Sequence, residues 1–125
     1  MIFDTDIFIW AQNGSDSVAD AIDAESDRSV SVITYIEFIQ GAKDKVQLGL
    51  NQSFFSDLNF QIIPLTPQVG IIASELIEKY ALSHSMRMAD ALIAATAIET
   101  GEVLATGNDK HYRQITELQL NIIRP

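Results

Sequence analysis

The acidic residues Asp4, Glu37 and Asp90 lie where apolar segments of the chain begin or end. Asp4 follows the apolar residues at the N-terminus, and Asp90 begins an apolar segment that continues to Ala97. A carboxylate beside a buried segment is costly to desolvate unless a cation compensates its charge. Several carboxylates within a few ångströms cannot all stay ionised without a counter-ion. If these acids meet in the fold, the chemistry that they predict is binding of Mg²⁺ or Mn²⁺ through oxygen ligands.

A further group of polar residues follows a predicted strand in the C-terminal part of the chain, in the run Thr106-Gly107-Asn108-Asp109. As a turn and helix cap this run would be ordinary. As part of a site it offers one more oxygen ligand, either Asn108 or Asp109, and Thr106 could contact a phosphate. Both assignments of the fourth ligand stay open at this point.

Each acid also has a simpler structural interpretation. Thr5 or Asp6 is expected to cap the helix that follows the first strand. The Thr34-x-x-Glu37 spacing is typical of a capping box, so Glu37 could cap the helix, bind the cation, or do either. An acid in the first helical turn, such as Asp90, gains about 0.3–1 kcal/mol from the helix dipole without any catalytic role. An acid at the head of an otherwise apolar, buried helix nevertheless favours a functional role, because buried charges are seldom left without a partner.

Composition restricts the classes of chemistry. The chain has 125 residues and no cysteine, which excludes disulfides, thiolate zinc sites and cysteine nucleophiles. His84 and His111 are far apart in the sequence and have no second pair, so a zinc site is disfavoured. The N-terminal residues have neither the basic start of a secretory signal nor a membrane-spanning apolar run. We therefore expect a soluble protein of the cytoplasm.

The net charge of −9 is unusual for a protein that binds nucleic acid. Bound divalent cations would reverse the sign of the charge locally. Four of the eight basic residues, Lys43, Arg87, Lys110 and Arg113, also lie within six residues of a candidate site acid. We expect Arg87 and Lys110 in particular to contact substrate phosphates, although each could equally be an ordinary solvated side chain.

Hydrophobic periodicity predicts alternating strands and helices. The expected strands are 1–4, 29–32, 60–63, 103–105 and 120–123, and the expected helices are 7–11, 17–26, 34–43, 46–58, 67–80, 89–100 and 109–115. Five short strands separated by helices indicate an α/β fold, with a mostly parallel sheet covered on both faces. The functional crevice of such a sheet lies beyond the carboxyl ends of its strands, where the candidate acids are expected.

Taken together, these segments resemble the PIN domain, and specifically the VapC-type toxins of bacterial toxin–antitoxin pairs. The resemblance rests on Asp4-Thr5-Asp6, on Glu37 with Gly41, on the run Asp90-Ala-Leu-Ile-Ala-Ala-Thr-Ala, and on Thr106-Gly-Asn-x-x-His-Tyr. It covers nearly the whole chain in the expected order. It implies one PIN-like domain over residues 1–125, a three-layer α/β/α sandwich with four or five strands in its sheet.

The same resemblance implies a Mg²⁺- or Mn²⁺-dependent endoribonuclease that forms homodimers and is inhibited by a cognate antitoxin. It assigns Asp4, Glu37 and Asp90, with Asn108 or Asp109, to the metal and the catalysis, and Thr5 and Thr106 to substrate contacts. Asp6 stands where the family usually has asparagine, so it could join the metal shell or cap the helix. An apolar groove for the antitoxin is expected near Ile7, Phe8 and Trp10, unless these residues belong to the core.

Two other functions fit part of the sequence. Asp4-Thr5-Asp6 also matches the Asp-x-Asp of haloacid-dehalogenase-type phosphatases, but the later paired acids and the cap insertion of that class do not appear. A receiver domain is disfavoured because the third strand ends at Pro64 with no acceptor aspartate. A PIN-like fold that serves only as a binding scaffold is the non-enzymatic alternative.

Overall fold

The computed structural model describes all residues from 1 to 125, and a five-stranded sheet lies at its centre. The strands are β1 (Ile2–Phe3), β2 (Ser29–Ser31), β3 (Gln61–Ile63), β4 (Leu104–Thr106) and β5 (Leu120–Ile122). Their order is β3-β2-β1-β4-β5, and every neighbouring pair is parallel. Ile2 of the central strand pairs with Ser29 on one side and with Leu104 on the other. The predicted parallel sheet is confirmed.

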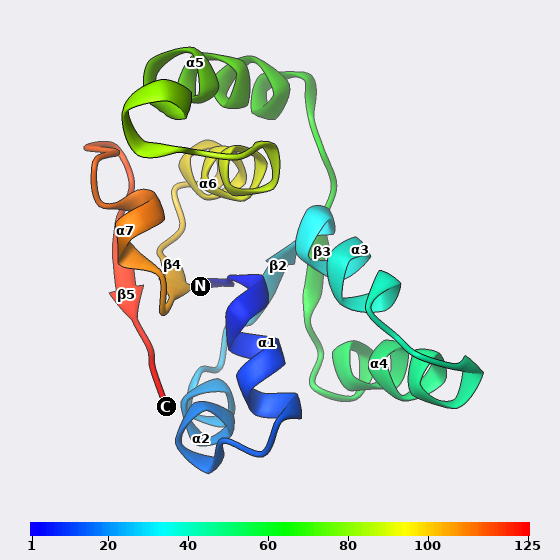
Figure 1. Cartoon of the computed structure of the whole chain (residues 1–125). Helices are drawn as coiled ribbons and strands as arrows, with labels where there is room; N and C mark the ends of the chain where they lie inside the picture. The colour runs from blue at the N-terminus through cyan, green and yellow to red at the C-terminus, as the bar shows by residue number, and fades with distance from the viewer.

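Seven helices connect the strands and cover the sheet on both faces (Figure 1). They are α1 (Thr5–Gln12), α2 (Asp16–Ala24), α3 (Val32–Gln40), α4 (Lys45–Asp57), α5 (Pro67–His84), α6 (Met88–Thr100) and α7 (Asp109–Tyr112). Figure 1 shows α5 and α6 together on one side of the sheet and α1, α2 and α4 on the other. The predicted α/β/α arrangement is therefore the observed one.

Two apolar cores lie on the two faces of the sheet. Residues of α5, α6 and α7 pack on one face together with Ile2, and residues of α1, α2, α3 and α4 pack on the other together with Phe3. Ile2 and Phe3 point to opposite faces because successive side chains of a strand alternate. Ile7 and Phe8 are buried in the second core and Trp10 packs partly buried against it, so these residues are core, although Phe8 also lines a neighbouring pocket. None of the helices is long and apolar enough to cross a lipid bilayer.

The two helices that carry candidate acids near their starts begin differently from the prediction. Ser31, not Thr34, caps α3, and its hydroxyl accepts a hydrogen bond from the Ile33 amide at 3.1 Å. Asp4 itself, rather than Thr5 or Asp6, caps α1, and its carboxylate accepts from the Thr5 amide at 2.8 Å. In both cases the helix starts directly after the strand, because the last strand residue or its neighbour supplies the cap.

The alanine-rich helix α6 packs tightly against the sheet. Ala91, Ala94 and Ala95 are completely buried, and Gly101 ends the helix in the left-handed conformation with φ of 71°. Small side chains allow the helix axis to approach the strands closely. The N-terminal turn of α6, with Asp90, is thereby brought to the carboxyl edge of the sheet.

Candidate active site

The candidate acids come from elements that meet at one edge of the sheet. Asp4 directly follows β1, and Thr106 is the last residue of the neighbouring strand β4. Glu37 lies in α3, which begins where β2 ends, and Asp90 lies in the first turn of α6. Because all five strands are parallel, these carboxyl ends form the same crevice.

Asp4 is a buried carboxylate, with only 7% of its surface exposed. The Thr106 hydroxyl donates to its Oδ2 at 2.8 Å, and the Thr5 amide donates to its Oδ1. Burial, together with the negative charge of Asp6, raises the pKa of Asp4 from 3.8 to about 7, although these hydrogen bonds act in the opposite direction. No positively charged group of the protein therefore compensates the negative charge of Asp4.

Asp6 lies beside Asp4 and faces the turn after β4. Its Oδ2 accepts a hydrogen bond from the Gly107 amide at 3.1 Å, while its Oδ1 is buried and has no hydrogen-bond partner. Burial raises the pKa of Asp6 above its usual value. A buried, unsatisfied carboxylate oxygen is expensive, and it is commonly explained by an ion or water that completes its coordination. Asp6 therefore does not cap α1 and instead adds a second carboxylate to the crevice.

Glu37 accepts a hydrogen bond from a threonine hydroxyl. Thr5 Oγ1 donates to Glu37 Oε1 at 2.7 Å, and Thr34 Oγ1 lies 3.2 Å from Thr5 Oγ1. Glu37 does not reach back to the Thr34 amide, because the helix already starts at Val32. The capping-box interpretation of Thr34 and Glu37 is therefore wrong, and the exposed carboxylate of Glu37 projects at the crevice instead.

Asp90 contacts two residues of the short helix α7. The Tyr112 hydroxyl donates to Asp90 Oδ1 at 3.3 Å, and His111 Nδ1 lies 3.1 Å from Asp90 Oδ2. The Asn108 amide nitrogen lies 3.2 Å from His111 Nδ1. These contacts attach the end of β4 and the start of α6 to each other, although the two segments are far apart in the sequence.

The turn after β4 is packed too closely for any side chain at Gly107. A Cβ atom there would lie 2.1 Å from the Trp10 ring and 2.9 Å from the Ile123 carbonyl oxygen. Arg124 fixes the turn from outside, since its Nε donates to the Gly107 carbonyl at 3.0 Å and its Nη2 donates to Asp109 Oδ1 at 2.7 Å. Asp109 is thus paired with arginine, which leaves Asn108 as the better candidate for a fourth oxygen ligand.

The chain matches the PIN domain over residues 1–118. It belongs to the PIN domain family. This assignment confirms the family resemblance inferred from Asp4-Thr5-Asp6, Glu37, Asp90 and the turn after Ala105.

Solved structures similar to this PIN domain come from toxin–antitoxin complexes. A toxin–antitoxin complex from Klebsiella pneumoniae is 27% identical with a TM-score of 0.79, covering 94% of this chain and 93% of that chain. VapBC2 from Rickettsia felis, solved bound to a DNA fragment from its promoter, is 25% identical with a TM-score of 0.79, covering 99% and 100%. VapBC-1 from nontypeable Haemophilus influenzae shares the fold at 23% identity, with a TM-score of 0.78 and 98% of both chains covered. No curated protein matches the chain. This PIN domain is thus of the kind found in VapBC toxin–antitoxin complexes.

The donor chemistry of the PIN domain site suits a hard divalent cation. All candidate ligands are oxygen atoms, which a hard divalent cation prefers. A positive charge would also stabilise the Asp6 Oδ1 atom, which has no hydrogen-bond partner, and the buried Asp4 carboxylate. No three acidic or histidine side chains lie close enough together to hold one ion as they stand. A shared ion would therefore need the carboxylates of Glu37 and Asp90 to turn toward Asp4. That these three acids bind one ion stays a prediction.

The residues predicted to bind phosphates lie at the surface of the PIN domain. Arg87 and Lys110 are both exposed, and Arg87 immediately precedes α6.

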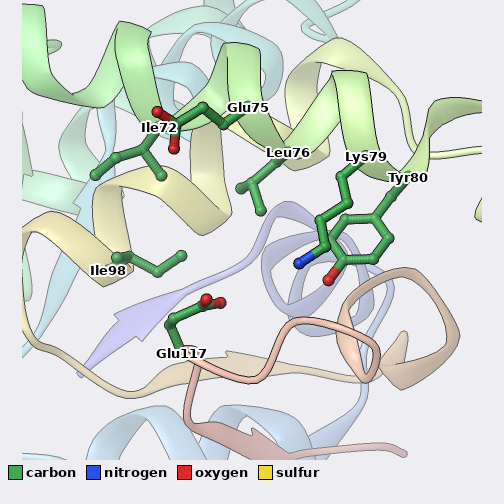
Figure 2. Close-up of a pocket in the computed structure, with 7 residues that line it drawn as sticks. All are labelled: Ile72, Glu75, Leu76, Lys79, Tyr80, Ile98 and Glu117. Atoms are coloured by element: carbon green, nitrogen blue, oxygen red, sulfur yellow. The ribbon is translucent and has the colours of Figure 1, made fainter.

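A pocket of about 190 Å³ under α5 includes none of the predicted site residues (Figure 2). A smaller hollow of about 180 Å³ does include Thr5 and Glu37, so the acids and not the larger cavities mark the site.

Two residues of the site, Tyr112 and Arg124, have no role predicted from the sequence, and Trp10 is expected only in the apolar groove. Tyr112 belongs to the run Thr106-Gly-Asn-x-x-His-Tyr, which carries part of the family resemblance, so its place in that run is a usable signal. Trp10 contacts Gly107, and Arg124 binds the same turn, but both are far from it in the sequence. No local sequence pattern predicts such long-range contacts.

Proposed function

We propose that this PIN domain is a Mg²⁺- or Mn²⁺-dependent endoribonuclease, the toxin of a toxin–antitoxin pair. The observation that carries the proposal is the buried Asp4 carboxylate, which adjoins the unsatisfied oxygen of Asp6 at the carboxyl edge of the sheet. Membership of the PIN domain family and similarity to toxin–antitoxin structures support the same conclusion.

The residues of the chain have distinct roles in this proposal. Asp4, Glu37 and Asp90 would hold the ion, with Asn108 as a further ligand. When bound, a divalent cation supplies Lewis-acid activation of water and of the phosphodiester. The Thr5 and Thr106 hydroxyls orient the Glu37 and Asp4 carboxylates, to which they donate hydrogen bonds of 2.7 and 2.8 Å.

Phosphates of the substrate would approach from the exposed side of the crevice. Arg87, before α6, and Lys110, in α7, have exposed side chains on the two segments that flank Asp90. Both are free to bind phosphates, whereas Arg124 is already engaged with the turn after β4. Local positive charge of this kind offsets part of the net charge of −9.

The decisive experiment compares purified variants in an RNA cleavage assay. Asp4→Asn, Glu37→Gln and Asp90→Asn should each lose cleavage in Mg²⁺ or Mn²⁺, and EDTA should abolish the activity of the parent protein. Glu78→Gln is the matched control, because Glu78 is an exposed acid of α5 far from the crevice. If Asp90→Asn cleaves RNA at the parental rate, the assignment of Asp90 is wrong.

Two further measurements separate this function from the alternatives. Calorimetry with Mn²⁺ should show binding that Asp90→Asn removes, whereas a binding scaffold would show none. Mapping RNA ends after brief induction in cells should reveal both the class of RNA and the cleavage sequence. Metal-dependent hydrolysis of a small phosphomonoester, without RNA cleavage, would support a phosphatase instead.

We also propose that a cognate antitoxin binds the apolar groove formed by α1, α3 and α4. A pocket of about 300 Å³ there is lined mainly by apolar side chains, which include Phe8, Phe38, Leu50 and Phe54. Phe38 also lines the hollow that contains Thr5 and Glu37, so a partner seated in the groove would reach the acids.

Co-expression with the antitoxin tests this surface. Leu50→Asp should leave RNA cleavage intact but weaken inhibition by the antitoxin, because Leu50 is 66% exposed at the groove. Val46→Asp is the control, since Val46 is an exposed apolar residue of the same helix that does not line the pocket. Equal inhibition of both variants would place the antitoxin elsewhere. Light scattering of the free toxin would test the expected homodimer.

A further inference from the structure

A single phenolic hydroxyl lies between two of the candidate acids. The Tyr112 hydroxyl donates to Asp90 Oδ1 at 3.3 Å, and the nearby negative charge of Asp4 acts on the same hydroxyl. Asp4 follows the central strand and Asp90 belongs to helix α6, so these two acids are 86 residues apart in the sequence. Tyr112 binds Asp90 directly and lies near Asp4.

The aromatic ring of Tyr112 is tightly packed in the core. It is completely buried, and it belongs to the apolar core formed with α5 and α6. The backbone around it is also fixed, because the Ile115 amide donates to the Tyr112 carbonyl at 3.0 Å. Since the ring is locked by packing, the position of its hydroxyl is determined by the fold and does not depend on the acids.

The charge environment keeps this hydroxyl protonated. Burial and the negative charges of Asp4 and Asp90 raise the pKa of Tyr112 well above its usual value. A neutral phenol has one proton to donate, and an ionised carboxylate can only accept. Tyr112 can therefore serve either acid as a donor without adding charge to the crevice.

We propose that Tyr112 is a positioning residue that keeps the Asp90 carboxylate beside Asp4 and so favours binding of a divalent cation between the two acids. This inference rests on the proposed metal-dependent function. Groups that hydrogen-bond to metal ligands typically change metal affinity by about 10–100-fold when they are removed. Thr106 orients Asp4 and Thr5 links Asp4 to Glu37, whereas Tyr112 acts on Asp90 in helix α6.

Tyr112→Phe tests the proposal, because it removes the hydroxyl and keeps the buried ring. Calorimetry should show Mn²⁺ affinity weakened by roughly 10–100-fold relative to the parent chain. Tyr80→Phe is the matched control (Figure 2). Tyr80 is also largely buried, but its hydroxyl donates to the Gln114 carbonyl at 3.1 Å and contacts no acid.

The outcomes separate the two proposals. If the parent chain binds Mn²⁺, Asp4→Asn abolishes binding, and Tyr112→Phe binds as the parent does, then the role of Tyr112 is refuted while the proposed function stands. If the parent chain itself binds no Mn²⁺, both proposals fail. Equal loss of affinity in Tyr112→Phe and Tyr80→Phe would show a general effect of core tyrosines and would also refute the role.

A measurement on the unaltered protein covers the case in which Tyr112→Phe does not fold. The chain has three tyrosines, so selective carbon-13 labelling of the phenolic carbon gives three resolvable signals. Saturating Mg²⁺ should shift the Tyr112 signal, because the hydrogen bonds of its hydroxyl change when the carboxylates bind the ion, and should leave the Tyr80 signal in place. A Tyr112 signal that does not move while Mg²⁺ binds would overturn the inference.

Discussion

At the scale of single residues, Asp4 combines two roles that its position in the sequence offers as alternatives, a helix cap and an acid of the site. Its carboxylate caps α1 through the Thr5 amide, and the same carboxylate lies buried at the head of the crevice. Capping satisfies a helical amide without neutralising the charge. The electrostatic cost of Asp4 is therefore still present in the metal-free protein, and it can be measured.

The stability of the metal-free protein should fall as pH rises through the range in which Asp4 titrates. The pKa of Asp4 is about 7 in the folded protein, and its ordinary value is 3.8. Between these two pH values the folded state therefore binds a proton at Asp4 that the unfolded state does not. Stability is then greatest below the lower value and decreases by up to about 1.4 kcal/mol per pH unit toward the upper one.

Asp4→Asn should remove this contribution. In EDTA, urea unfolding should show the variant to be more stable than the parent at about pH 8, with the difference shrinking toward pH 4. The excess stability at high pH arises because the neutral amide carries no buried charge. Two stability profiles that run parallel across this range would contradict the raised pKa of Asp4.

At the scale of the elements, the polar residues at the ends of the short strands lie at the crevice, where helix caps and turns hold them. Ser31 ends β2 and caps α3, and Thr106 ends β4 and binds Asp4. Gly107 then allows Trp10 and the Ile123 backbone to close over the turn. The positions of the acids thus depend on a few contacts at strand ends.

Ser31→Ala should destabilise the fold by about 1 kcal/mol, because the Ile33 amide loses its capping acceptor. Glu37→Gln should change stability by much less, since Glu37 does not cap α3. Urea unfolding of both variants measures the difference. The reverse ranking would restore the capping box of Thr34 and Glu37.

Gly107→Ala should destabilise the protein by about 1–3 kcal/mol through overpacking. The new methyl group would meet the Trp10 ring and the Ile123 carbonyl oxygen, and the backbone oxygen cannot move aside easily. Gly49→Ala is the control, because a Cβ atom at this helical position meets nothing within 4 Å. The control should be more stable than the parent by about 0.4–1 kcal/mol. Thermal or urea unfolding that shows equal effects would mean that the turn can relax.

At the scale of the whole molecule, the net charge of −9 opposes binding of a polyanion. Part of that charge is concentrated in the crevice, where Asp4 and Asp6 share one buried region. Bound divalent cations would change the sign of the field at the place where we propose that RNA phosphates dock. RNA binding is therefore expected to depend on the ion and not on a general basic surface.

Fluorescence anisotropy can test this dependence with a labelled single-stranded RNA. Affinity should be several-fold higher in Ca²⁺ than in EDTA at matched ionic strength, because the cation offsets the carboxylates without requiring turnover. Asp4→Asn in EDTA should also bind more tightly than the parent in EDTA. Affinity that is identical in Ca²⁺ and EDTA would show that RNA is bound away from the acids.

The order of the elements, the parallel sheet and the family could all be predicted from the amino-acid sequence alone. Apolar periodicity and the residues at strand ends are local properties, so they can be recognised without coordinates. Local reasoning also placed Asp4, Glu37 and Asp90 at the edge of the sheet, but it misjudged the caps of α1 and α3, where two nearby residues competed for one role.

The contacts between side chains, in contrast, are visible only in the folded protein. The fold pairs Asp109 with Arg124, sets Trp10 against Gly107, and places the Tyr112 hydroxyl between two acids. Each contact joins segments that are distant along the chain, and each depends on the close packing of helices against the sheet. Such packing is a property of the whole fold, and no short stretch of sequence encodes it.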